Sequence, residues 1–158
     1  MILLRGTWII LKFVKDKDNR LTHNQWSGGQ YLNSTLGFTK GTTATVFTIE
    51  NDSLKVSNDG QSQYTSCKIQ YNVTSEDHLK TMTLTSKIIS HDYDIYLQLY
   101  IDNTWKQLAQ LPKSDTFQIL ELSGIIPENS EVLEFRWSPV GNKLDAVFYL
   151  KYISLTIQ

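Results

Sequence analysis

Short runs in which apolar and polar residues alternate recur along most of this 158-residue chain. In residues 79–89, Met82, Leu84 and Ile88 alternate with threonines and a lysine. In residues 93–101, isoleucines and leucines alternate with acidic, amide and tyrosine side chains. Successive side chains of a strand point to opposite faces, so a period of two predicts strands with one buried face.

Similar runs fill most of the remaining chain, and residues typical of turns separate them. The runs cover residues 1–14, 45–50, 53–57, 64–73, 104–108, 116–122, 131–137 and 146–157, and Gly or Pro marks predicted loops at 123–129 and 138–142. No segment has a helical period of useful length. About ten strands at regular spacing predict an all-β fold, a β-sandwich jelly roll of two antiparallel sheets. No repeat or linker divides the chain, so residues 1–158 are interpreted as one domain.

Residues 15–43 differ from the rest because they are rich in Asn, Gln, Gly, Ser and Thr. Three aromatic side chains, those of Trp26, Tyr31 and Phe38, lie among them. A polar stretch of this length in a compact domain is either a functional loop or a poorly ordered one. Trp26 and Tyr31 are therefore one candidate ligand-binding platform.

Charge and terminal composition exclude several functions. The formal net charge is −1, with Lys and Arg scattered along the chain, so binding to nucleic acid is not expected. Near the N-terminus, Arg5 precedes and Lys12 follows the apolar run at residues 8–11, which is too short to span a membrane and poorly built for a signal peptide. We expect no membrane insertion. An extracellular or virion-associated location still fits, for example on a particle released by lysis.

The chain offers no recognisable catalytic constellation. Its single cysteine, Cys67, lies in an alternating run, which favours a buried structural thiol. No Gly-x-Ser-x-Gly, His-Glu-x-x-His or Gly-rich phosphate loop is present. The acidic residues considered for glycoside hydrolysis lie in strands and turns where exposed acids are common; they are Asp115, Glu121, Glu128, Glu131, Glu134 and Asp145. We therefore predict that the protein is not an enzyme.

Several segments together resemble a known family. They are the strand at residues 52–56, the strand–turn–strand at 93–108, the closing strand at 148–156, and an opening in which residues 3–7 are followed by Trp26-Ser27-Gly28-Gly29. Their order resembles carbohydrate-binding-module-like, galactose-binding-type jelly rolls, and the opening is similar to modules in phage and prophage tail proteins. The resemblance implies a glycan or polysaccharide as partner.

Members of this family often hold a structural calcium partly through an acid in the final strand. Alignment on Ile153-Ser154-Leu155 puts Lys151 at that position. Calcium requires oxygen ligands, which an ammonium group does not provide. Asp92, Asp94 and Asp115 are interpreted as solvated turn or edge carboxylates. We expect no cofactor, and Lys151 argues against the calcium.

A second candidate platform lies on predicted strands. Tyr96, Gln98 and Tyr100 share the polar face of one strand, and Glu134 and Arg136 share that of another. Flat rings beside amides and charges suit a sugar, whose C–H face stacks on aromatic side chains. If the two strands share a sheet, these five residues would form a concave polar–aromatic surface. The alternative is that the tyrosines are ordinary half-exposed strand residues and that Arg136 merely pairs with Glu134 or with a neighbouring strand.

The remaining tryptophans have different expected roles. Trp105 follows the turn at residues 102–103, where it would either stack on a ligand at the rim or close the end of the core. Trp8 and Trp137 alternate with core-facing residues and are interpreted as packing residues.

Two functions follow from these observations. The first is a non-catalytic carbohydrate-binding module that attaches its carrier to a glycan, in a phage or prophage tail or a surface protein. The alternative is a structural jelly roll of a tail, fibre or capsid that binds protein, because interfaces also enrich Tyr, Trp and Arg. As further partners, we consider other copies of the same chain in a homo-oligomer, or a larger carrier protein.

Overall fold

The computed structural model describes residues 38–158, except 62, 102 and 142, and all regular elements in this part are β-strands. They are β1 (Phe38–Lys40), β2 (Thr45–Glu50), β3 (Ser53–Asn58), β4 (Cys67–Asn72), β5 (Thr81–Ile89), β6 (Ile95–Ile101), β7 (Thr104–Leu111), β8 (Gln118–Ile125), β9 (Val132–Pro139) and β10 (Phe148–Ile157). Trp8, Trp26 and Tyr31, and with them the polar platform predicted before residue 38, lie outside the described residues.

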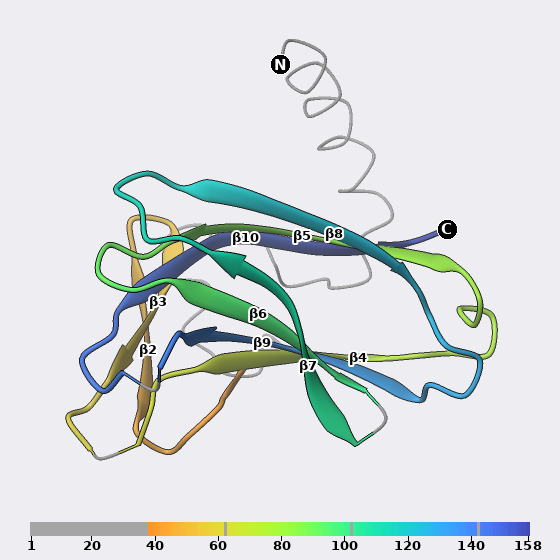
Figure 1. The fold of residues 1–158 in the computed structure, drawn as a ribbon, viewed down its shortest axis with the longest axis horizontal. Helices are drawn as coiled ribbons and strands as arrows, with labels where there is room; N and C mark the ends of the chain where they lie inside the picture. Colours follow the sequence, from red (N-terminus) through yellow and green to blue (C-terminus); the bar gives the residue numbers. More distant parts are fainter. Residues whose placement is uncertain (1–37, 62, 102, 142) are drawn as a thin grey trace, which may run out of the picture.

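The strands form two five-stranded sheets, with the orders β1-β4-β9-β6-β7 and β2-β3-β10-β5-β8. All paired neighbours are antiparallel. In Figure 1, β10, β5 and β8 lie across the top, and β6, β9 and β4 form a second layer below them. The chain is therefore an all-β sandwich of two antiparallel sheets, as its alternating runs predict.

The core lies between the two sheets and consists of the apolar members of the alternating runs. Phe135, Trp137 and Phe148 are its largest side chains and are completely buried. Cys67 is also completely buried, which confirms the prediction of a structural thiol. Burial of apolar surface contributes about 25 cal/mol per Å². This free energy of burial determines which face of each strand points inward. The polar residues of the alternating runs consequently lie on the outer faces of the sheets.

Several strand bounds differ from the predicted ones, and in three places a strand occupies residues that predicted a loop. β8 continues through Ile125 because Thr81 of β5 pairs with it, although Gly124 and the following proline predicted a loop. β9 continues to Pro139, which lies opposite Ile95. A proline donates no backbone hydrogen bond, so it is accommodated at the last position of this strand. β1 falls within the predicted polar loop because its backbone pairs with β4.

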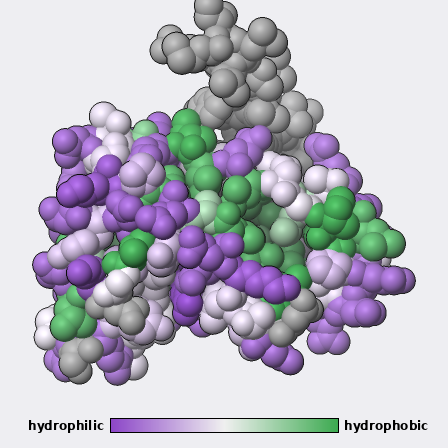
Figure 2. All heavy atoms as spheres, viewed as in Figure 1, coloured by the Kyte–Doolittle hydropathy of each residue, from purple (hydrophilic) through white to green (hydrophobic). Residues whose placement is uncertain are grey.

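The outer surface of the described residues is largely hydrophilic, with separate apolar areas. Figure 2 shows hydrophilic residues over most of the face in view and smaller hydrophobic groups between them. In the part of the chain that the structure describes, no helix has the length and hydrophobicity needed to cross a membrane.

Candidate functional site

The two strands that carry the predicted polar–aromatic residues are neighbours in one sheet. β6 pairs with β9, with Gln98 opposite Arg136 and Tyr100 opposite Glu134. Leu133, Phe135 and Trp137 of β9 are completely buried, so the alternate residues Glu134 and Arg136 lie on the outer face. The structure thus brings together two groups of residues, one on each strand, that are far apart in the sequence.

β7 adds Trp105 to this group. Trp105 lies opposite Tyr100, and the centroids of the two rings are 5.1 Å apart at an interplanar angle of 53°. Trp105 is half-buried on the outer face and does not belong to the core cluster. We call the outward side chains Tyr96, Gln98, Tyr100, Trp105, Glu134 and Arg136 the β6–β9 face.

Arg136 is the centre of the contacts on this face. Its Nε donates a hydrogen bond to Oε1 of Gln98 at 2.9 Å, and its Cζ lies over the Trp105 ring, 4.1 Å from the centroid. The Gln98 oxygen also accepts a longer hydrogen bond of 3.4 Å from Ser138 Oγ. A guanidinium group held by stacking and by one in-plane hydrogen bond has a fixed plane. One ring face of Trp105 is thereby covered by Arg136.

β4 supplies two residues that sequence reasoning missed. Lys68 lies opposite Arg136 in the strand register, and Gln70 lies opposite Glu134. The Lys68 ammonium nonetheless contacts Glu134 Oε1 at 3.1 Å, so the lysine reaches diagonally to the acid. The alternation within residues 64–73 could have assigned Lys68 and Gln70 to an outer face. It could not have shown that β9 is the neighbouring strand.

The plainer interpretation of this strand had Arg136 paired with Glu134 or with a neighbouring strand. In the structure Arg136 contacts the neighbouring strand, through Gln98 of β6, and Glu134 contacts Lys68. In the described residues Glu134 is paired with Lys68, and no carboxylate lies within 4.0 Å of Arg136. Asp94 precedes β6 at the margin of the face, where it accepts hydrogen bonds from the Lys113 backbone N–H and from the Gln110 amide. These two donors hold the pKa of Asp94 below its usual value, so it is ionised at neutral pH.

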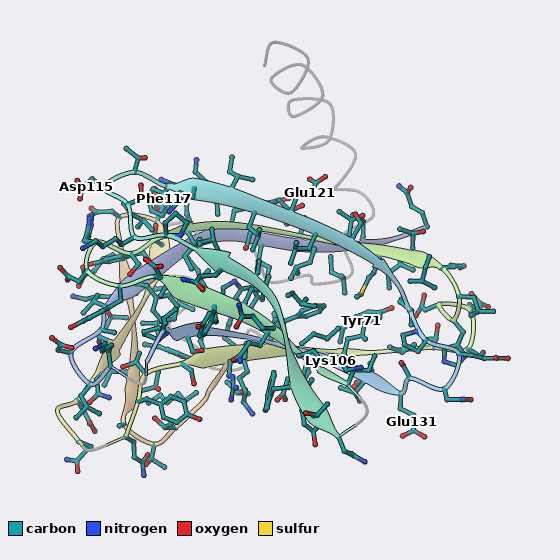
Figure 3. The ribbon with its side chains drawn as sticks, viewed as in Figure 1. Tyr71, Lys106, Asp115, Phe117, Glu121 and Glu131 are labelled. Atoms are coloured by element: carbon teal, nitrogen blue, oxygen red, sulfur yellow. The ribbon has the colours of Figure 1, made fainter. Side chains whose placement is uncertain are left out.

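The carboxylates considered for catalysis do not gather into one site. In Figure 3, Asp115 and Glu131 lie at opposite ends of the sandwich, and Glu121 lies on β8 between them. Asp145 accepts hydrogen bonds from the Tyr93 hydroxyl at 2.8 and 2.9 Å. A glycosidase needs two carboxylates on either side of one bond, about 5–10 Å apart. Asp115, Glu121 and Glu131 are instead spread along the sandwich.

The residues around Lys151 do not fit a calcium ion. The Lys151 Nζ lies 5.5 Å and the Lys87 Nζ 5.8 Å from the centroid of the Phe117 ring, which is seen near one end of β8 in Figure 3. Two ammonium groups on one ring supply positive charge and no oxygen ligands. Within the described residues, no group of three or more His, Cys, Asp or Glu side chains is arranged to hold a metal.

Solved structures with the same arrangement of strands include carbohydrate-binding modules. A CBM4 structure superimposes with a TM-score of 0.57 at 12% identity, covering 84% of each chain. A family 29 carbohydrate-binding module from Piromyces equi superimposes with a TM-score of 0.58 at 14% identity, covering 84% of this chain and 88% of that one. The chain has the fold of these carbohydrate-binding modules.

A tailspike protein shares the fold as well. The enzymatically active domain structure of tailspike protein 4 from bacteriophage CBA120 superimposes with a TM-score of 0.64 at 13% identity. The match covers 89% of this chain and 22% of the tailspike chain. No protein-family model and no curated protein matches the sequence. At these identities the likeness is one of fold, and the ligand has to be argued from the residues.

Proposed function

We propose that the protein is a non-catalytic glycan-binding module and that the β6–β9 face is its binding surface. The observation that carries this proposal is the convergence of Tyr96, Tyr100 and Trp105 with the amide of Gln98 and the guanidinium of Arg136 on adjacent strands. Rings offer the apolar contact that a sugar's C–H face requires, and the amide and guanidinium N–H groups offer donors to its hydroxyls.

Tyr100 is the ring best placed for stacking. It is 38% exposed, whereas Trp105 is half-buried with one ring face covered by Arg136. Trp105 then acts mainly by holding the guanidinium and buttressing Tyr100. One sugar residue of the glycan rests on Tyr100, and Tyr96, four residues away on the same face of β6, offers a second ring to another sugar residue. Gln70 of β4 is a further amide within the same outer face.

The carrier and the location belong to the same proposal. A glycan-binding module of this kind attaches a phage or prophage tail, or a surface protein, to a cell, and therefore acts outside the cell or on a virion. The fold likeness to a tailspike chain supports the tail context. The same likeness favours the second candidate, a jelly roll that binds protein inside a tail or fibre.

Glycan-array binding followed by titration of the best ligand tests the proposal. Tyr100→Ala should weaken binding by about 5-fold or more, because the loss of an aromatic stacking contact is worth about 1 kcal/mol or more. Tyr149→Ala is the matched control, since Tyr149 is a half-buried tyrosine on the other sheet. Both variants are checked for folding by thermal melting.

The two candidate functions predict different results. A glycan ligand whose affinity falls in Tyr100→Ala and not in the Tyr149→Ala control supports glycan binding at this face. Absence of any glycan ligand at high protein concentration, together with a stable oligomer by solution mass measurement, contradicts it and supports the assembly domain.

A further inference from the structure

Arg136 is the cation of the β6–β9 face, and among the described residues no acidic side chain is paired with it. The ionisable groups directed outward from the paired strands β4, β9 and β6 are Lys68, Glu134 and Arg136, apart from the tyrosine phenols. Lys68 and Glu134 neutralise each other across 3.1 Å, with side-chain exposures of 26% and 13%. The face therefore keeps one positive charge, located on the guanidinium.

Asp94, which precedes β6 at the margin of the face, is not paired with Arg136 in the described residues. Its carboxylate is occupied by the Gln110 amide and the Lys113 backbone.

The guanidinium is oriented with its binding edge free. Nε is occupied by Gln98, and the plane lies against Trp105. In the described residues the two Nη atoms have no hydrogen bond, so the pair of N–H groups at the end of the side chain is available to a ligand. That pair matches the two oxygens of a carboxylate in spacing and in planarity. Stacking on Trp105 also removes the usual entropy cost of ordering a long arginine side chain.

We propose that the glycan recognised by this face is acidic, with a uronic-acid carboxylate bound end-on by the two Nη atoms of Arg136 while a sugar ring rests on Tyr100. This inference rests on the proposed glycan-binding function. The neutral Lys68–Glu134 pair borders the site and leaves the carboxylate no repelling neighbour, because Glu134 is already occupied by the lysine.

The experiment uses the full chain and paired polysaccharide probes. Polygalacturonate, alginate and hyaluronan are each compared with their carboxyl-reduced forms, beside neutral glucan, mannan and galactan. Binding to at least one acidic probe is expected, and carboxyl reduction should lower its affinity about 10- to 100-fold, the range for a lost charge-assisted hydrogen-bond pair. Affinity for the acidic probe should also fall as salt concentration rises.

Two variants test whether the preference for an acidic probe over its reduced form depends on the guanidinium of Arg136. Arg136→Gln should remove the difference between an acidic probe and its reduced form, and Arg136→Lys should retain only part of it because a lysine lacks the planar fork. Lys106→Gln is the control, because it also removes one positive charge and lies next to Trp105 on β7. Lys106 pairs in register with the core residue Leu99 and does not belong to the β6–β9 face. The Lys106→Gln variant should leave the preference intact.

The outcomes separate this inference from the function on which it rests. Binding only to neutral glucan, mannan or galactan overturns the acidic ligand and keeps the glycan-binding function. An acidic preference that survives in folded Arg136→Gln overturns the role of Arg136. Absence of binding to every probe overturns both proposals.

Discussion

The contact between Gly41 and Ser66 is the tightest backbone approach at a glycine in the described part of the chain. The Gly41 N–H donates to the Ser66 carbonyl at 2.9 Å. A Cβ at position 41 would lie 1.6 Å from Ser66 Oγ, 2.9 Å from Ser66 Cβ and 3.2 Å from the Ser66 carbonyl oxygen. Position 41 therefore has no room for any side chain, whatever its polarity.

Gly41→Ala should destabilise the protein by about 1–3 kcal/mol, as overpacking of a well-packed site does. Gly124→Ala is the matched control, because a Cβ there would meet only Met82 Cε at an ordinary 3.6 Å. Urea unfolding of both variants measures the difference. Equal unfolding midpoints for Gly41→Ala and the wild type would show that Ser66 can move aside freely.

For single residues, the sequence predicts well which side chains lie on the outer face, but it predicts poorly which of them touch one another. The predicted group Tyr96, Gln98, Tyr100, Glu134 and Arg136 is brought together on one face, because alternation already assigned each of them to the polar side of its strand. Lys68 was missed since it lies 66 residues from Glu134, and only strand order makes them neighbours.

The β2–β3 hairpin shows how one element depends on its turn. Asn51 and Asp52 connect the strands with φ angles of 50° and 57°, both left-handed. A two-residue turn with two positive φ values matches the twist of a hairpin, and Asn and Asp tolerate that geometry better than other non-glycine residues. The turn chemistry was readable from the sequence because it is local.

Asn51→Val should destabilise the protein by about 1–2 kcal/mol, because a β-branched residue is strained in the left-handed region. The control is Asn72→Val, which places the same side chain at an exposed position in β4, where valine is favourable. Thermal unfolding compares them. Equal melting temperatures for the two variants would show that valine is not strained at position 51, contrary to what the φ angle of Asn51 implies.

Strand ends were predicted less well than strand centres. β8 and β9 extend past residues that usually end strands, to Ile125 and Pro139, because a neighbouring strand continues alongside each of them. Gly and Pro express a local preference, whereas pairing with β5 and β6 adds hydrogen bonds that a local pattern cannot anticipate.

The whole sandwich encloses Cys67 on all sides. The side chain is completely buried in the cluster that contains Trp137 and Phe135, and burial raises the pKa of its thiol well above the usual value. The thiolate is the reactive form, so both access and ionisation oppose modification in the folded protein.

Labelling of Cys67 by a thiol reagent should therefore be more than about 1,000-fold slower in the folded protein than for free cysteine, since it requires an opening that costs much of the unfolding free energy. Labelling rates across a urea titration should follow the global unfolding curve. Fast labelling in native buffer without any loss of the β-sheet signal would mean that the sandwich opens locally at β4.

The sequence by itself determined the fold class, the inward and outward sides of most strands, and the candidate residues of the β6–β9 face. Those properties follow from the period-two pattern, which every strand carries independently of its neighbours. Only the tertiary structure decided that β4, β9, β6 and β7 lie side by side, that Lys68 neutralises Glu134, and that Trp105 and Gln98 hold a guanidinium whose Nη atoms stay free. Strand order depends on how the two sheets bury their apolar faces together, and that is a property of the assembled core.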